Sequence, residues 1–145
     1  MTQRVVLALD LGTRTGWALQ DALGHVFSGA QDFSLHRGDS PGMRYLRLDA
    51  WLTGMLPLAA ESIALIGYER AHHRGGPATE VAIGFATTLQ AWCAEHHVEH
   101  TAVHSAALKK STTGRGNADK PMMARCARRR GWLPAGREVG DDEVD

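Results

Sequence analysis

Two almost continuous apolar runs, each ending on a carboxylate, are the features that most constrain this sequence. Residues 4–10 read RVVLALD and residues 62–69 read SIALIGYE. Short aliphatic runs of this kind, bounded by turn residues, predict strands inside a sheet that is covered on both faces. An ionised acid at the end of such a strand lies close to the core and needs a partner or a metal ion. If the two strands are neighbours, we expect Asp10 and Glu69 to converge at one end of the sheet.

The rest of the pattern predicts a mixed sheet with helices packed against it. Strands are expected near residues 16–20 and 26–33, where glycine-containing turns precede each run, so the first three strands are antiparallel. A last short strand is expected over residues 100–103. The fold class is therefore α/β, with about five strands in one mixed sheet flanked by helices.

Two amphipathic helices are expected between these strands. Ser40 is the expected N-cap of a helix over residues 43–55, and the apolar stripe of this helix consists of Met43, Leu46, Ala50 and residues 52–55. Pro77 begins the second helix, in which apolar residues recur at spacings of three and four. These residues are Val81, Phe85, Leu89, Trp92 and Cys93. The second stripe is expected either in the core or at a dimer interface.

The length and composition predict one domain over residues 1–145. With 43% hydrophobic residues the chain can bury one core, but it is too short for two comfortable ones. It contains no run of eighteen apolar residues and does not begin like a secretory signal, so we expect a soluble, cytoplasmic protein that contacts no membrane. Cys93 and Cys126 lack metal-ligand spacing and are expected to be reduced and structural.

Charge is unevenly distributed although the net charge is zero. Residues 1–103 carry a net charge of −3, residues 104–137 carry +8, and the last eight residues carry −5. A basic block beside an acidic terminus predicts one surface for a polyanion and a separate place for cations.

The carboxylates predict a metal site. Asp142 and Asp145 are spaced i and i+3, so they share a face if a helix begins there. Together with Asp10 and Glu69 they would form a cage that requires Mg²⁺ or Mn²⁺ to neutralise its charge. Two ions at roughly 3.5–4 Å activate water and stabilise the leaving oxygen of a phosphodiester, which is nuclease chemistry. Taken singly, each acid has a simpler role, because Asp10 can cap a turn, Glu69 can pair with a nearby arginine, and acidic tails are usually solvated.

Separated motifs in a consistent order resemble the RuvC-type Holliday junction resolvases of the ribonuclease H-like superfamily, and particularly their phage or prophage relatives. The opening LALDLGTRTGWAL resembles the family's first strand, with its metal-binding aspartate at Asp10. IGYER resembles the strand of the second acid, Glu69, and DDEVD resembles the start of the C-terminal helix, implying Asp142 and Asp145 as the last ligands. The resemblance implies a ribonuclease H-like fold, two-metal catalysis, and a homodimer that cuts branched DNA at two symmetric sites.

The basic segment supplies the expected DNA contacts. LKKSTTGRGNADK resembles the family's DNA-binding segment, implying that Lys109 and Lys120 approach the scissile phosphate, with Lys120 in the catalytic site. Its glycines, hydroxyls and arginine also suit phosphate binding by themselves. The expected DNA-binding residues are Lys109, Lys110, Thr113, Arg115, Asn117, Lys120, Arg74 and His72. His72 stands where the family usually has an aromatic residue that stacks on bases.

Two other functions fit parts of the sequence. Because the family continues through a full helix after the last acid, we expect the chain to lack most of this helix beyond Asp145, and a protein with an incomplete site would bind branched DNA without cutting it. The DLGT motif also occurs in actin-like nucleotide-binding domains, although these proteins need two such domains. ATP binding without DNA binding would favour that second alternative.

Overall fold

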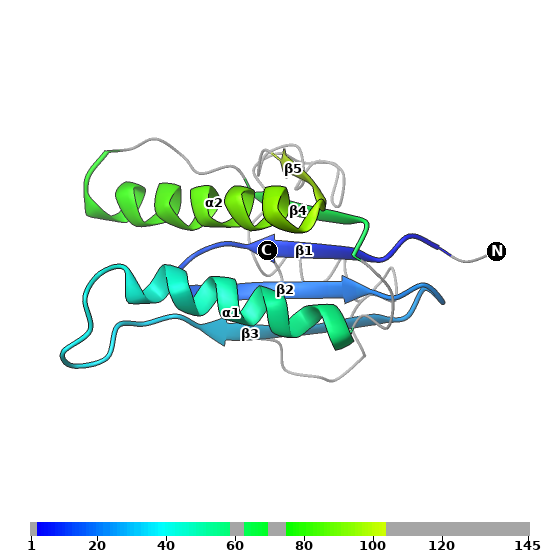
Figure 1. Cartoon of the computed structure of the whole chain (residues 1–145), viewed down its shortest axis with the longest axis horizontal. Helices are drawn as coiled ribbons and strands as arrows, with labels where there is room; N and C mark the ends of the chain where they lie inside the picture. Colours follow the sequence, from blue (N-terminus) through cyan, green and yellow to red (C-terminus); the bar gives the residue numbers. More distant parts are fainter. Residues whose placement is uncertain (1–2, 59–62, 70–74, 104–145) are drawn as a thin grey trace, which may run out of the picture.

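Five strands form one mixed sheet in the computed structural model, which describes residues 3–58, 63–69 and 75–103 (Figure 1). The strands are β1 (Val6–Asp10), β2 (Arg14–Gln20), β3 (Val26–Asp32), β4 (Leu65–Glu69) and β5 (Glu99–Val103). Their order is β3-β2-β1-β4-β5, with antiparallel pairing among the first three and parallel pairing of β1 with β4 and of β4 with β5. The predicted class and the antiparallel start are confirmed, and β1 and β4 are neighbours.

Two helices, α1 (Met43–Leu58) and α2 (Pro77–His96), lie side by side on one face of this sheet (Figure 1). The residues that α2 buries are Phe85, Leu89, Trp92 and Cys93. Trp92 also joins the helices, because its Nε1 donates a hydrogen bond of 3.1 Å to Thr53 Oγ1 on α1. Neither helix has the length and apolar character that spanning a membrane requires.

The buried stripe of α2 belongs to the core of the single chain. Phe85 and Leu89 are 0% exposed and Trp92 is 1% exposed, and Phe33 after β3 packs against the Phe85 ring. The alternative prediction, that these residues form a dimer interface, is wrong because their apolar surface is already removed from water within the chain.

The boundaries of α1 differ from the prediction at both ends. The Leu46 amide donates the first helical hydrogen bond to the Gly42 carbonyl, so Gly42 is the N-cap and Ser40 is not. The helix also continues through Pro57 to Leu58. Proline supplies no amide donor, so Pro57 leaves the last turn one backbone hydrogen bond short.

The face that α1 buries was predicted correctly at Leu52 and Met55 but incorrectly at Leu46 and Ala50. Leu46 is 64% exposed and Ala50 is exposed, whereas Leu48, Leu52 and Met55 are buried. Both sets recur at helical spacing, so periodicity alone could not separate them. The buried set consists of three large side chains, and it removes more apolar surface from water than a set that includes alanine.

Cys93 lies within this core as a free thiol. Burial raises its pKa to about 11, because the thiolate would lose its hydration. A buried neutral thiol of this kind is unreactive near neutral pH, as is expected of a structural cysteine.

Candidate active site

The pairing of β1 with β4 brings Asp10 and Glu69 together. In this parallel pair Leu9 lies opposite Tyr68, and each acid is the next residue along its strand. Adjacent strands lie about 4.8 Å apart, so the acids occupy neighbouring positions at the same end of the sheet. The predicted convergence of Asp10 and Glu69 required their two strands to be neighbours, and in the structure they are.

Both acids lie on the face of the sheet opposite the helices. Side chains alternate between the two faces of a strand, and Leu9 and Tyr68 are buried in the core at 4% and 6% exposure. Asp10 and Glu69 therefore lie on the other face, where both are half-buried. Gly16 pairs with Asp10 from β2 and adds no side chain beside the carboxylate.

The turn that follows Asp10 is closed by a buried threonine. The Thr15 hydroxyl donates to the Gly12 carbonyl at 2.8 Å and accepts from the Gly12 amide at 3.3 Å. Thr15 is 0% exposed, so its hydroxyl depends on these protein partners. The Phe33 amide donates to the Thr13 carbonyl at 2.6 Å and attaches the same turn to the end of β3. The backbone leaving the acid is therefore held from two directions.

The acid pair has the donor chemistry of a divalent cation site. Two carboxylates at neighbouring positions carry negative charge that a divalent cation between them would neutralise. Mg²⁺ and Mn²⁺ prefer such oxygen ligands, so Asp10 and Glu69 fit either ion. Within the described part of the chain no three His, Cys, Asp or Glu residues come close enough to hold a metal, so this part contributes two of the four predicted ligands.

The other predicted site residues lie outside the described residues. They are the acids Asp142 and Asp145 and the DNA-binding residues Lys109, Lys110, Thr113, Arg115, Asn117, Lys120, Arg74 and His72. Their roles stay predictions.

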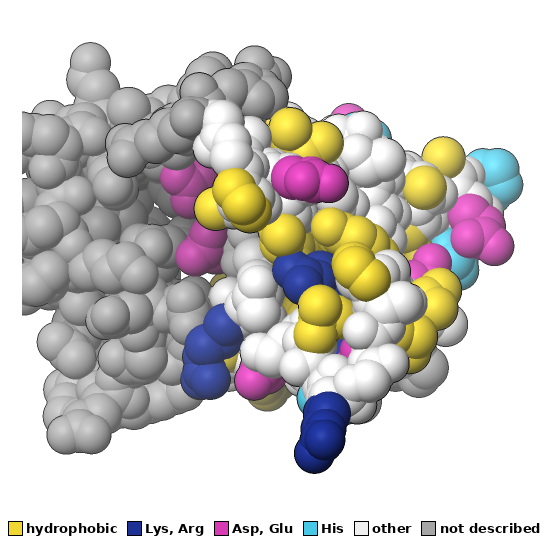
Figure 2. Space-filling view, turned by 90° about the vertical axis from the view of Figure 1, so that its left-hand side faces the viewer, with side chains coloured by type: hydrophobic (Ala, Val, Ile, Leu, Met, Phe, Trp, Pro, Cys, Tyr) yellow, Lys and Arg dark blue, Asp and Glu magenta, His cyan; other side chains and the backbone are white. Residues whose placement is uncertain are grey.

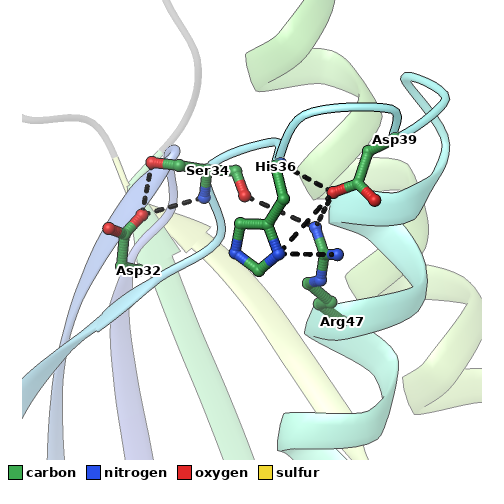
Figure 3. Close-up of polar contacts among 5 residues, drawn as sticks. All are labelled: Asp32, Ser34, His36, Asp39 and Arg47. Carbon is green, nitrogen blue, oxygen red and sulfur yellow. Dashed lines mark hydrogen bonds and ion pairs between the residues drawn. The ribbon is translucent and has the colours of Figure 1, made fainter.

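A polar network that the sequence reasoning missed fixes the connection between β3 and α1 (Figure 3). Asp39 Oδ2 accepts a hydrogen bond from the His36 amide at 2.7 Å and pairs with Arg47 Nη1 at 2.7 Å. The Arg47 guanidinium and the His36 amide hold the pKa of Asp39 below its ordinary value. Asp32 caps the start of the connection by accepting bonds from the Ser34 amide and hydroxyl. The Asp-x-Ser and Arg-Gly-Asp patterns are turn signals from which this connection could have been predicted.

This network lies at the same end of the sheet as the acid pair. The β1 arrow ends where α1 and α2 begin (Figure 1), and Asp32 at the end of β3 pairs with Arg14 at the start of β2. Figure 2 views the molecule from this end and shows acidic, basic and apolar side chains interspersed on it. The described part of this end of the molecule therefore carries side chains of both charges.

Comparison with known proteins identifies the fold. No protein-family model and no curated protein matches the sequence. Thermus thermophilus RuvC shares 16% identity over 96% of this chain and 87% of its own, with a TM-score of 0.73. The structure of T. thermophilus RuvC in complex with Holliday junction substrate gives 17% identity, 97% and 87% coverage, and a TM-score of 0.76. The yeast mitochondrial Holliday junction resolvase Ydc2 gives 14% identity, 99% and 74% coverage, and a TM-score of 0.59. The predicted RuvC-like, ribonuclease H-like fold is thereby confirmed, and the resemblance to phage relatives stays a prediction.

Proposed function

We propose that this chain, which has the fold of the RuvC resolvases, is a structure-selective endodeoxyribonuclease that cuts Holliday junctions or other branched DNA. The observation that carries the proposal is the register of β1 and β4, which sets Asp10 beside Glu69 at one end of the sheet. The fold supports it, because solved structures that match nearly the whole chain are junction resolvases. An actin-like nucleotide-binding fragment is the other candidate, and ATP binding without DNA binding would favour it.

In this proposal Asp10, Glu69, Asp142 and Asp145 hold divalent cations, which supply an activated water and stabilise the leaving oxygen. Asp10 and Glu69 are well suited to the task because each is fixed by a strand of the sheet and their spacing is set by main-chain pairing. Thr15 keeps the turn after Asp10 closed. Lys120 is the proposed contact to the scissile phosphate.

The basic segment of residues 104–137 is the proposed DNA-binding element. Its net charge of +8 suits neutralisation of several phosphates, so binding should weaken steeply as salt rises. Resolution of a four-way junction needs two symmetric cuts, which a homodimer provides by geometry. We therefore propose a homodimer, formed through surfaces other than the buried stripe of α2.

The proposal is tested by incubating a labelled synthetic four-way junction and a linear duplex with the chain in Mg²⁺, Mn²⁺ or EDTA. We expect paired nicks in the junction that require the metal ion. Asp10→Asn and Glu69→Gln should each lower the nicking rate by at least about two orders of magnitude, because each removes a cation ligand. Both variants should still bind the junction.

The matched control is Glu95→Gln, which removes one carboxylate from the exposed surface near the C-terminal end of α2, away from the acid pair. It should cut at the wild-type rate. Full activity of Asp10→Asn would refute the catalytic assignment. Junction binding without nicking by the wild-type chain in any metal would instead favour a non-catalytic junction-binding protein.

A further inference from the structure

The arginines of the described residues are concentrated at the end of the sheet that carries Asp10 and Glu69. This part of the chain contains five arginines and no lysine. Arg14 begins β2, Arg37 lies in the connection after β3, and Arg44 and Arg47 lie near the start of α1. These four lie at the site end, whereas the fifth, Arg4, precedes β1 at the opposite end and pairs with Glu99. A cation used for substrate binding should therefore be sought among the four.

Arg37 differs from Arg47 and Arg14 because it is not held by a contact with another described residue. Arg47 is engaged by Asp39, and Arg14 has an interaction of its own and lies opposite Asp32. Within the described part of the chain, Arg37 makes no ion pair or hydrogen bond, and it is exposed. Arg44 follows Arg37 by seven residues, and its Nε is buried without a hydrogen-bond partner. A second arginine in this region therefore has an N–H group that is not hydrogen-bonded.

The backbone that carries Arg37 is a tight turn with a fixed shape. The Asp39 amide donates to the His36 carbonyl at 3.0 Å, and Gly38 has a φ of 87°. A positive φ at the third position, after a residue with negative φ, defines a type II turn in which Arg37 occupies the second position. Glycine at the third position avoids the strain that a side chain would cause.

The turn is also anchored to α1 by side chains (Figure 3). Arg47 bonds Asp39 at 2.7 Å, the Ser34 carbonyl at 3.4 Å and His36 Nδ1 at 3.3 Å. The network thus uses one arginine to hold the turn, while the arginine at its tip has no such role. A charged side chain on a preorganised turn loses less entropy on binding than one on a loose loop.

We propose that the turn His36–Asp39 presents Arg37 to a backbone phosphate of the DNA strand that approaches the acid pair. The inference rests on the proposed nuclease function and adds a DNA contact separate from the basic segment of residues 104–137. β3 lies two strands from β1, about 10 Å away, and Arg37 follows five residues after Asp32. The contacted phosphate lies about 10 to 20 Å from the acid pair.

The test compares Arg37→Gln with Arg4→Gln, which removes the same charge from the opposite end. Affinity for a synthetic four-way junction is measured by fluorescence anisotropy in EDTA between about 50 and 200 mM salt. Arg37→Gln should weaken binding by roughly fivefold to tenfold and reduce the slope of log affinity against log salt by about one. Arg37→Lys should keep the slope, and Arg4→Gln should match the wild type. Neutral methylphosphonates are also placed one at a time along the strand, and one of them, about 10 to 20 Å from the nick, should weaken wild-type binding but not that of Arg37→Gln.

The outcomes separate the two proposals. If the wild-type chain binds and nicks junctions while Arg37→Gln keeps the wild-type affinity and slope, this inference is refuted and the nuclease proposal stands. An equal loss in Arg4→Gln and Arg37→Gln would also refute it, because the effect would then follow net charge rather than a local contact. A wild-type chain that binds no junction would overturn both.

Discussion

Replacing Thr15 with valine should destabilise the protein by about 2 kcal/mol. Valine has nearly the same shape, but it removes the hydroxyl that bonds both the Gly12 carbonyl and the Gly12 amide inside a buried turn. Leaving a buried polar group without a partner costs about 1–3 kcal/mol, and the 3.3 Å bond to the amide adds little because it is long. Thr15→Ser keeps the hydroxyl and loses one buried methyl group, at about 1 kcal/mol.

Thermal unfolding of the two variants tests this ranking. For a chain of 145 residues, 1 kcal/mol shifts Tm by about 3 °C, so Thr15→Val should melt about 6 °C and Thr15→Ser about 3 °C below the wild type. At a temperature where both variants are folded, Thr15→Val should also nick junctions more slowly than Thr15→Ser, because the turn that follows Asp10 is no longer closed. A valine variant at least as stable as the serine variant would show that the hydroxyl does not hold the turn.

Two further predictions follow from packing and from charge. Gly84→Ala should destabilise the fold by about 1–3 kcal/mol, because a Cβ there would overlap the hydroxyl and the ring carbons Cζ and Cε1 of Tyr45, and in urea unfolding the same substitution should cost less in a Tyr45→Ala background. Asp39→Asn should lower stability more at neutral pH than in acid. Since the folded pKa of Asp39 lies below 3.8, its contribution is present above that pH and disappears as pH falls through the folded value. Melting curves at pH 7 and at about pH 2 should show a larger difference between wild type and variant at pH 7.

The sheet could be predicted because its signals are local and strong. The apolar runs of β1 and β4 fit few structures besides buried strands, and the glycine turns around β2 limit the pairing of the first three strands. The buried face of α1 was harder, since Leu46 and Leu48 both belong to acceptable helical stripes. Only the position of α1 against the sheet decides between them, and periodicity carries no information about that position.

In the candidate site too, single residues could be identified from the local sequence, whereas their contacts depend on the folded structure. Asp10 was identified from the end of its own strand, but its proximity to Glu69 depends on which strands are neighbours. The Arg47 to Asp39 pair was missed because the two residues come from a loop and from the second turn of a helix, and their contact requires the fold. Turn chemistry would have located the His36–Asp39 turn, but not its anchor.

The convergence of the two acids follows from core packing on the other face of the sheet. Because side chains alternate along a strand, burying Leu9 and Tyr68 against the helices forces the next residue of each strand to the opposite face. A slip of one residue in the pairing of β1 with β4 would move one acid into the core or one large apolar side chain into water, and either change is costly. The hydrophobic effect therefore selects the register that sets Asp10 beside Glu69.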